Sequence, residues 1–127
     1  MKKLKIIYIL ISITLLISCK YDIINKLPGG YGYVPEGSPC HNSFIDKDNN
    51  VLNFRVNNLK YNDNFIVFKV LDSLKCVNND LENLKDGDYK YFIYDIENRV
   101  NFGPLEKQVF KTKFSNLKIS SDLDLDK

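Results

Sequence analysis

The chain has 127 residues, of which 44% are hydrophobic and 27% are charged, and its formal net charge is +2. This length suits one small domain with a single hydrophobic core, so a second domain is not expected. The lysines are scattered among acidic residues and form no basic stripe. The composition therefore argues against nucleic-acid binding, which depends on a concentrated positive surface.

The N-terminus has the parts of an export signal. Lysines at positions 2, 3 and 5 precede an apolar run over residues 6–17, and Ser18 and Cys19 follow. A basic segment, a short apolar segment and a small residue before the cleavage point are typical of such signals. The apolar run has twelve residues, whereas a membrane-spanning helix needs roughly 20. We therefore predict a cleaved signal over residues 1–18 rather than a transmembrane anchor.

The segment Leu16-Ile17-Ser18-Cys19 resembles the bacterial lipobox, Leu-x-x-Cys. The resemblance implies that the Cys19 thiol receives diacylglycerol, with fatty acids such as palmitate, and anchors the protein to a membrane of the cell envelope. Two or three acyl chains give stable anchoring, whereas one holds only marginally. Because Lys20 is not the aspartate associated with inner-membrane retention, the outer membrane is expected in a double-membraned host and the cell membrane otherwise. The alternative is an ordinary cleaved signal with an incidental cysteine.

Processing would change the charge of the chain, because three of the 18 basic residues leave with the signal and all 16 acidic residues stay, so the formal net charge falls from +2 to −1. Residues 19–26 would form a short lipidated tether. A single globular domain is expected over residues 27–119, and an acidic tail over residues 120–127, which we expect to fray.

Seven glycines and prolines within residues 27–39 exclude a helix there and predict a loop or a broken edge strand. In an extended segment Tyr31 and Tyr33 would point to the same side. Two interpretations remain open for this pair. The tyrosines are surface aromatics that stack on a ligand, or they are lids over the core, which is the commoner use of aromatic residues near glycines.

The middle of the chain alternates short apolar runs with polar turns, which indicates antiparallel strands. Residues 46–50 predict a hairpin turn, and the nearly continuous apolar run over residues 65–71 predicts a central strand. Residues 89–96 are apolar on both faces and predict an interior strand. The expected strands cover residues 44–45, 51–56, 65–71, 89–96 and 99–102.

Two helices are expected. Residues 79–84 favour a short one, and Pro104 in the first helical position predicts a longer one that reaches about Asn116. The buried stripe of the longer helix comprises Leu105, Val109, Phe110, Phe114 and Leu117. The predicted fold class is α+β, with a small antiparallel sheet of about five strands and one C-terminal helix packed on a face.

Several short segments resemble a family of short, uncharacterised bacterial lipoproteins. These are Gly30-Tyr31, residues 61–67 (Tyr-Asn-Asp-Asn-Phe-Ile-Val) and residues 91–95 (Tyr-Phe-Ile-Tyr-Asp), followed by Asn98, Gly103-Pro104-Leu105 and Phe110. The resemblance spans most of the mature chain and consists of strand and turn residues. It implies that the protein is a lipid-anchored lipoprotein, and it implies no activity, cofactor or catalytic residue.

The cysteines leave two alternatives open. In an exported chain Cys40 and Cys76 can form a disulfide, which would close a loop of about 36 residues and contribute on the order of 3 to 4 kcal/mol; otherwise they are two free buried thiols. Free thiols would allow a nucleophile paired with His41, or a zinc site, although no third orienting residue and no fourth ligand can be named. A solvated loop histidine is the commoner role for His41.

No cofactor or metal is expected. Residues 46–50 resemble the start of an EF-hand loop, but Val51 stands where a glycine is needed and Asn57 where a glutamate is needed. The leading hypothesis is a lipid-anchored envelope protein of unknown molecular function that acts as a non-catalytic interaction or accessory module, with another envelope protein as partner. One alternative is a small envelope enzyme or metal-dependent module using Cys40, His41 and Cys76. Another is an immunity or inhibitor protein.

Overall fold

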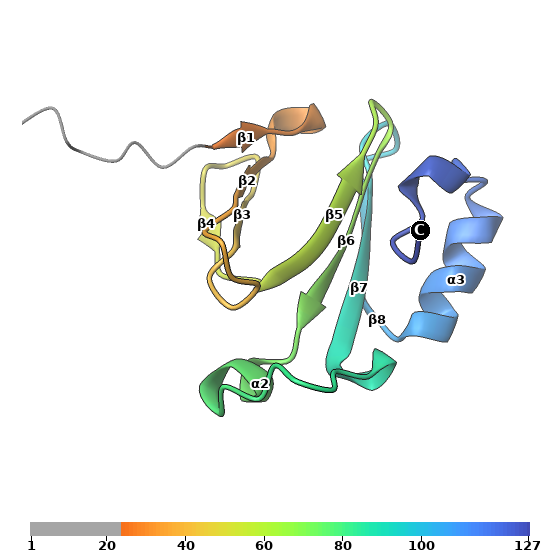
Figure 1. The fold of residues 1–127 in the computed structure, drawn as a ribbon. Coiled ribbons are helices and arrows are strands. Elements are labelled where there is room, and N and C mark those ends of the chain that lie inside the picture. Colours follow the sequence, from red (N-terminus) through yellow and green to blue (C-terminus); the bar gives the residue numbers. More distant parts are fainter. Residues whose placement is uncertain (1–23) are drawn as a thin grey trace, which may run out of the picture.

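The computed structural model describes residues 24–127, so the predicted signal, Cys19 and most of the predicted tether lie outside the described residues. Within residues 24–127, eight strands form two antiparallel four-stranded sheets, in the orders β1-β2-β3-β4 and β5-β6-β7-β8 (Figure 1). The strands are β1 (Asn25–Lys26), β2 (Gly32–Val34), β3 (Ser43–Ile45), β4 (Val51–Leu52), β5 (Val56–Tyr61), β6 (Phe65–Leu71), β7 (Tyr89–Asp95) and β8 (Val100–Leu105). The helices are α2 (Ser73–Val77) and α3 (Lys107–Asn116), with 3₁₀ turns η1 (Pro28–Gly30), η2 (Asp86–Asp88) and η3 (Ser121–Leu123).

The large sheet, β5 to β8, is the middle layer of the molecule. Figure 1 shows the small sheet, β1 to β4, on one side of it and α3 with the C-terminal segment on the other. Alternate residues of β6 serve the two sides, since Ile66 and Phe68 face the small sheet whereas Val67 faces the helix. Burial on both faces explains why β6 is almost continuously apolar, and the strand predicted over residues 65–71 is confirmed.

The core between the two sheets is aromatic. Phe44 of the small sheet is fully buried, and its ring centroid lies 4.9 Å from that of Phe68 on β6. Phe68 in turn stacks on Phe92 of β7, also at 4.9 Å. Offset aromatic pairs of this kind add to the stabilisation that burial alone gives.

The prediction of about five strands in one sheet is wrong in detail, although the antiparallel, mixed character is confirmed. The glycine-rich segment predicted as a loop or a broken edge strand contributes β2, a short strand that pairs with strands on both sides. Gly32 allows this pairing because a Cβ there would lie 3.2 Å from Ile24 Cγ2 and 3.3 Å from Ile45 Cβ. The absence of a side chain therefore lets β2 fit between its neighbours.

The strand predicted over residues 51–56 is also divided. The predicted hairpin is present, with β3 pairing β4 across the turn, but β4 ends at Leu52 and Val56 begins β5 of the other sheet. Arg55 between them has a φ of 53°, which no regular strand permits. The chain crosses from the small sheet to the large one at this point.

The C-terminal helix begins later than predicted. Pro104 belongs to β8, and α3 starts at Lys107 and ends at Asn116. Gly103, at φ 139°, packs so closely on Phe92 that a Cβ would lie 2.4 Å from the ring. Only glycine fits at position 103, and the pairing of Leu105 with Tyr91 extends β8 beyond Pro104. Phe110 is buried and stacks on Tyr91 at 4.8 Å, whereas Val109, predicted in the buried stripe, is 52% exposed.

The acidic C-terminal segment, which was expected to fray, is packed against the domain. Leu123 and Leu125 are buried against the helix side of the large sheet together with Ile119. The side chains of Asn58 and Lys60 on β5 donate hydrogen bonds to the carbonyl oxygens of Leu125 and Asp124, at 3.0 and 2.5 Å. The alternation of aspartate and leucine over residues 122–126 therefore places leucines inside and aspartates outside.

The prediction of a short helix over residues 79–84 is wrong, and the short helix of this region is α2, at residues 73–77. Asp72 caps it by accepting a hydrogen bond from the Leu74 N–H at 2.9 Å. Asn79 and Asn83 have φ values of 52° and 57°, which exclude a continuous helix where one was expected. Neither α2 nor α3, nor any other helix within residues 24–127, is long and apolar enough to span a bilayer.

Candidate functional site

A hollow of about 480 Å³ lies where the ends of the two sheets meet. One wall comes from η1 and the residue after it, with Gly29 and Tyr31; another comes from the β3–β4 turn, with Lys47. The β7–β8 hairpin completes it with Asp95, Ile96, Arg99 and Asn101. Because three segments distant in sequence contribute, the hollow exists only in the folded chain.

Tyr31 forms the aromatic wall of this hollow. Its ring centroid lies 5.5 Å from Phe44 and 5.2 Å from Tyr94, so one side of the ring packs on the core between the sheets. Burial raises the pKa of Tyr94 to about 12, with smaller contributions from Tyr31 and Asp46. Tyr94 is therefore neutral at physiological pH. Tyr31 covers the core, as one interpretation expected, and it also lines the hollow, where it is accessible to a ligand as the other expected.

Asp95 is the buried carboxylate of the hollow, with an exposed fraction of 4%. Its Oδ1 accepts a hydrogen bond from the Asn98 backbone N–H at 3.0 Å, and its Oδ2 accepts one from the Asn98 Nδ2 at 2.8 Å. These bonds fix the β7–β8 turn, in which Arg99 has a φ of 55°. Asp95 thus positions the neighbouring Arg99 within the hairpin.

The β3–β4 turn is fixed in a similar way. Oδ1 of Asp46 accepts from the backbone N–H groups of Asp48 and Asn50 at 2.9 and 2.8 Å, and its Oδ2 accepts from Asn50 Nδ2 at 2.9 Å. The side-chain hydrogen bond from Asn50 is the largest of the effects that lower the pKa of Asp46. The turn that presents Lys47 is therefore organised by an ionised carboxylate.

Lys47 and Arg99 are the cationic groups of the hollow. Both are exposed, and within residues 24–127 neither has an ion pair, a side-chain hydrogen bond or a contact over an aromatic ring. Some other lysines are paired, as Lys107 contacts Asp86 at 3.0 Å and Asp126 at 3.2 Å. The charge of Lys47 and Arg99 is available to a ligand.

Tyr33, the other predicted surface aromatic, lies apart from this hollow. It is half-buried and packs against the core between the sheets, and burial raises its pKa. With Ile24, Leu59 and Tyr61 it lines a second hollow of about 400 Å³ beside β1 and β5. The structure does not bring Tyr31 and Tyr33 into one stacking surface.

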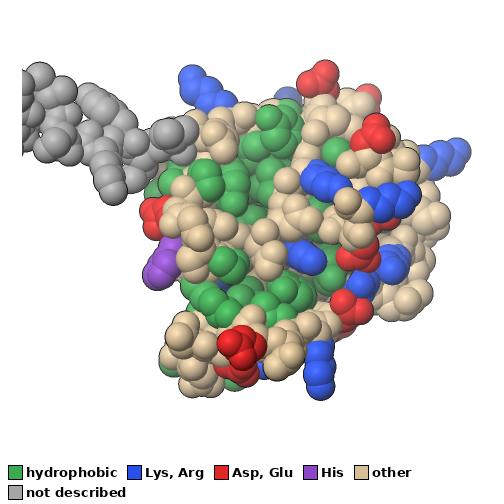
Figure 2. All heavy atoms as spheres, viewed as in Figure 1, with side chains coloured by type: hydrophobic (Ala, Val, Ile, Leu, Met, Phe, Trp, Pro, Cys, Tyr) green, Lys and Arg blue, Asp and Glu red, His purple; other side chains and the backbone are tan. Residues whose placement is uncertain are grey.

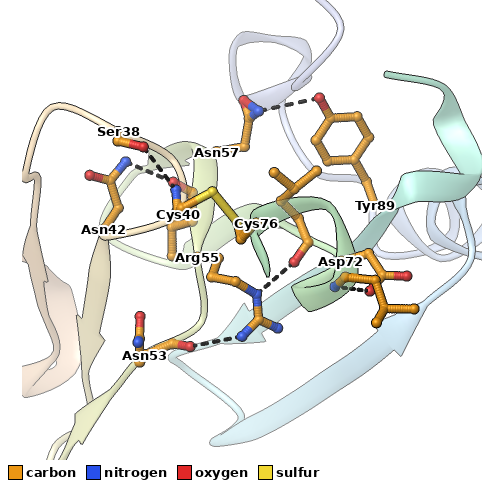
Figure 3. Close-up of a disulfide and its surroundings, with 12 residues drawn as sticks. Ser38, Cys40, Asn42, Asn53, Arg55, Asn57, Asp72, Cys76 and Tyr89 are labelled. Carbon is orange, nitrogen blue, oxygen red and sulfur yellow. Dashed lines mark hydrogen bonds between the residues drawn. A yellow bond between two sulfur atoms is a disulfide. The ribbon is translucent and has the colours of Figure 1, made fainter. Parts of the chain in front are cut away.

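Cys40 and Cys76 form a disulfide, with an S–S distance of 2.09 Å and a Cα–Cα distance of 5.6 Å (Figure 3). The bond joins the segment before β3 to α2, and Arg55 lies beside it, donating from Nε to the Leu71 carbonyl at 2.9 Å. Asn42, buried near the bond, donates from Nδ2 to the Val56 carbonyl at 2.8 Å. The surroundings therefore tie the small sheet to the large one.

The disulfide removes the basis of the thiol and zinc hypotheses in this form of the protein. Neither Cys40 nor Cys76 has a free thiol to ionise, and His41 is exposed next to the bond. In the described part of the chain, no three His, Cys, Asp or Glu side chains come together in a way that could hold a metal ion.

The face shown in Figure 2 carries apolar side chains over the small sheet and between it and β5, while charged side chains of both signs mix toward α3. No single-sign patch dominates this face. The distribution agrees with the scattered lysines of the sequence.

Sequence reasoning identified both turns but not the hollow between them. The sequence predicts a hairpin turn over residues 46–50, and the strands expected at residues 89–96 and 99–102 place a second turn at residues 97–98. The available signal was that each turn carries one cation next to an aspartate that can fix it. Nothing in the spacing of Lys47 and Arg99 indicates that the turns meet, since their approach depends on how the two sheets pack.

A family model described as "Protein of unknown function (DUF3997)" matches residues 37–127. No curated protein and no solved structure matches the chain. The matched residues include both disulfide cysteines and both cations of the hollow, whereas Gly29 and Tyr31 precede them. Since the match covers well over half of the sequence, the chain belongs to this family of unknown function.

Proposed function

We propose that this protein is a lipid-anchored component of the cell envelope that acts by binding a partner rather than by catalysis. The observation that supports it most is the segment Leu16-Ile17-Ser18-Cys19 after a basic and apolar N-terminus. This arrangement has the form of an export signal followed by an acylation point.

The disulfide supports the extracytoplasmic part of the proposal. Disulfides persist in oxidising compartments and are uncommon where thiols are kept reduced. Cys40 and Cys76 lie in separate segments, and their bond closes a loop of 36 residues. A cross-link of this kind suits a domain that works outside the cytoplasm.

The proximity of the folded domain to Cys19 supports anchoring close to the membrane surface. Asn25 is already paired in β1, opposite Tyr33. At about 3.4 Å per residue, the six steps from Cys19 to Asn25 span at most roughly 20 Å. A tether this short would keep the β1 end of the domain within reach of lipid headgroups.

The binding role is supported by the character of the hollow. Lys47, Arg99 and Asn101 offer hydrogen-bond donors, and Tyr31 and Ile96 offer apolar contact. Its carboxylate, Asp95, has both oxygens engaged by Asn98. These groups fit recognition of a ligand or partner better than proton transfer by a carboxylate pair.

Metabolic labelling tests the anchor directly. Cells that express the full chain are grown with radiolabelled palmitate, and the protein is immunoprecipitated and partitioned between detergent and water. We expect label and detergent partitioning in the wild type and neither in Cys19→Ala.

The matched control is the Cys40→Ser/Cys76→Ser variant, which loses two other cysteines and should keep the label. Incorporation of palmitate into Cys19→Ala, or a wild-type protein without label, would refute the anchor.

A further inference from the structure

We propose that the hollow between the sheet ends binds a phosphate-type oxyanion, held by Lys47 and Arg99. The hollow has a volume of about 480 Å³, which is within the range of roughly 300 to 1,000 Å³ that small-molecule sites occupy. It is open to solvent at the cations and closed at its base by side chains of the core.

The two cations suit an oxyanion because they are complementary donors. An arginine guanidinium can bind two oxygens of one phosphate with parallel hydrogen bonds, and a lysine ammonium adds a compact charge. Asn101, on the strand that follows Arg99, adds a side-chain amide to the same lining. Three side chains from two hairpins therefore bring hydrogen-bond donors to one lining.

The carboxylate in the lining does not cancel this attraction. Asp95 is 4% exposed, and both of its oxygens accept hydrogen bonds from Asn98. The lining has two cations and one carboxylate, so the formal charge of the lining is +1.

The two turns are organised in advance of binding. Asp46 accepts three hydrogen bonds inside the turn that carries Lys47, and Asp95 accepts two inside the turn that carries Arg99. Turns held in this way lose less conformational entropy when their side chains meet an anion.

The phosphate could come from two sources, and the apolar surface beside the hollow bears on the first of them. An adjoining hollow of about 370 Å³ shares Tyr31 and is lined by Ile24, Leu27 and Ile45. A phospholipid could place its phosphate between the cations and the first carbons of its acyl chains against this surface, and this source rests on the proposed function. A free phosphorylated compound is the other source and does not depend on the anchor.

The test titrates the full chain, isotope-labelled and kept in a phosphate-free detergent, in two arms. The first arm adds inorganic phosphate, and the second adds phosphatidylglycerol to the micelles, with amide chemical shifts as the readout. We expect saturable shifts centred on Lys47 and Arg99 in at least one arm. Saturation in both arms would assign the phosphate group itself as the ligand, and saturation in the second arm alone would assign the headgroup.

The variant Lys47→Gln/Arg99→Gln should weaken this binding by at least about tenfold, as expected when charge-assisted hydrogen bonds are lost. The control Lys118→Gln/Lys127→Gln removes the same charge from exposed positions outside the hollow and should change affinity less than about twofold. Thermal unfolding of each variant verifies that the fold is kept.

Absence of saturable binding in both arms, or equal weakening by the control, would overturn the proposal. Its failure is separable from that of the anchor. Palmitate labelling reports on Cys19 alone, and the phosphate arm reports on the hollow whether or not Cys19 carries lipid.

Discussion

The two faces of the large sheet are covered in different ways. The small sheet consists of strands of two or three residues, and segments this short have few ladder hydrogen bonds of their own. It is held instead by the aromatic contacts of Phe44 and by the disulfide from Cys40 to Cys76. The other face is covered by α3 and the segment that directly follows it, through apolar side chains and the ion pairs of Asp126.

This difference indicates how each region depends on distant residues. The small sheet is fixed by links to β6, β7 and α2, which lie far along the chain. The C-terminal cover is continuous in sequence and is held by many separate contacts, which include hydrogen bonds from Asn58 and Lys60 on β5. We therefore expect one substitution in the small sheet to cause a large loss in the free energy of unfolding. A substitution on the helix side should cause a smaller loss.

The largest effect is expected at Phe44. Phe44→Ala removes a fully buried ring and should lower the free energy of unfolding by about 3 to 5 kcal/mol. Chemical denaturation measures the loss. Val51→Ala, at a side chain that is 67% exposed on the paired strand, should change the free energy by less than about 0.5 kcal/mol. Similar losses in the two variants would contradict the account of this core.

The disulfide gives the next effect. Its loop of 36 residues predicts that Cys40→Ser/Cys76→Ser loses on the order of 3 to 4 kcal/mol. Hydrogen exchange should show the loss of protection first in β3 and in α2, while β6 and β7 stay protected. A uniform loss over both sheets would show that the bond does not act as a link for the small sheet in particular.

A smaller loss is expected in the C-terminal segment. Leu123→Ala, at a side chain that is 5% exposed, should cost about 2 to 3 kcal/mol, at the low end for buried leucines because the site lies near the surface. The matched control is Val109→Ala on the exposed side of α3, which should be nearly neutral. A frayed tail would instead make Leu123→Ala as mild as the control.

The smallest effect is the response to acid. Burial raises the pKa of Asp126, but hydrogen bonds and charge from Lys107 and Lys111 outweigh it and leave the pKa below the ordinary value of 3.8. The folded pKa is depressed, so this contribution is present above about pH 3.8 and is lost as pH falls through the folded value. On acidification, the melting temperature should fall less in Asp126→Asn than in the wild type. An identical acid response in both would contradict the role of these ion pairs.

The sequence predicts the two central strands of the large sheet, β6 and β7, well. It predicts no strand over most of β5, and it predicts the small sheet poorly. Residues 65–71 and 89–95 are apolar on both faces, and this pattern depends little on distant contacts. The role of Gly32 in β2, by contrast, appears only when its neighbours Ile24 and Ile45 are in place. The same holds for Gly103, which lies in β8 and must lack a side chain because it packs on Phe92.

The candidate site was harder to predict for the same reason. Tyr31 could be identified as an aromatic near the surface, but its neighbours Lys47 and Arg99 come from turns of different sheets. Their meeting depends on the packing between the sheets, which local patterns do not specify. The cysteines had two open alternatives because a disulfide requires a distance that spacing cannot give.

The proposed lipid anchor at Cys19 is the central claim. Its most direct test is the intact mass of the protein extracted from the membranes of its own host. We predict a chain that begins at Cys19 and exceeds the mass of residues 19–127 by a diacylglycerol group, with or without a further acyl chain. A chain with no fatty acid, or one that begins at another residue, would contradict the account.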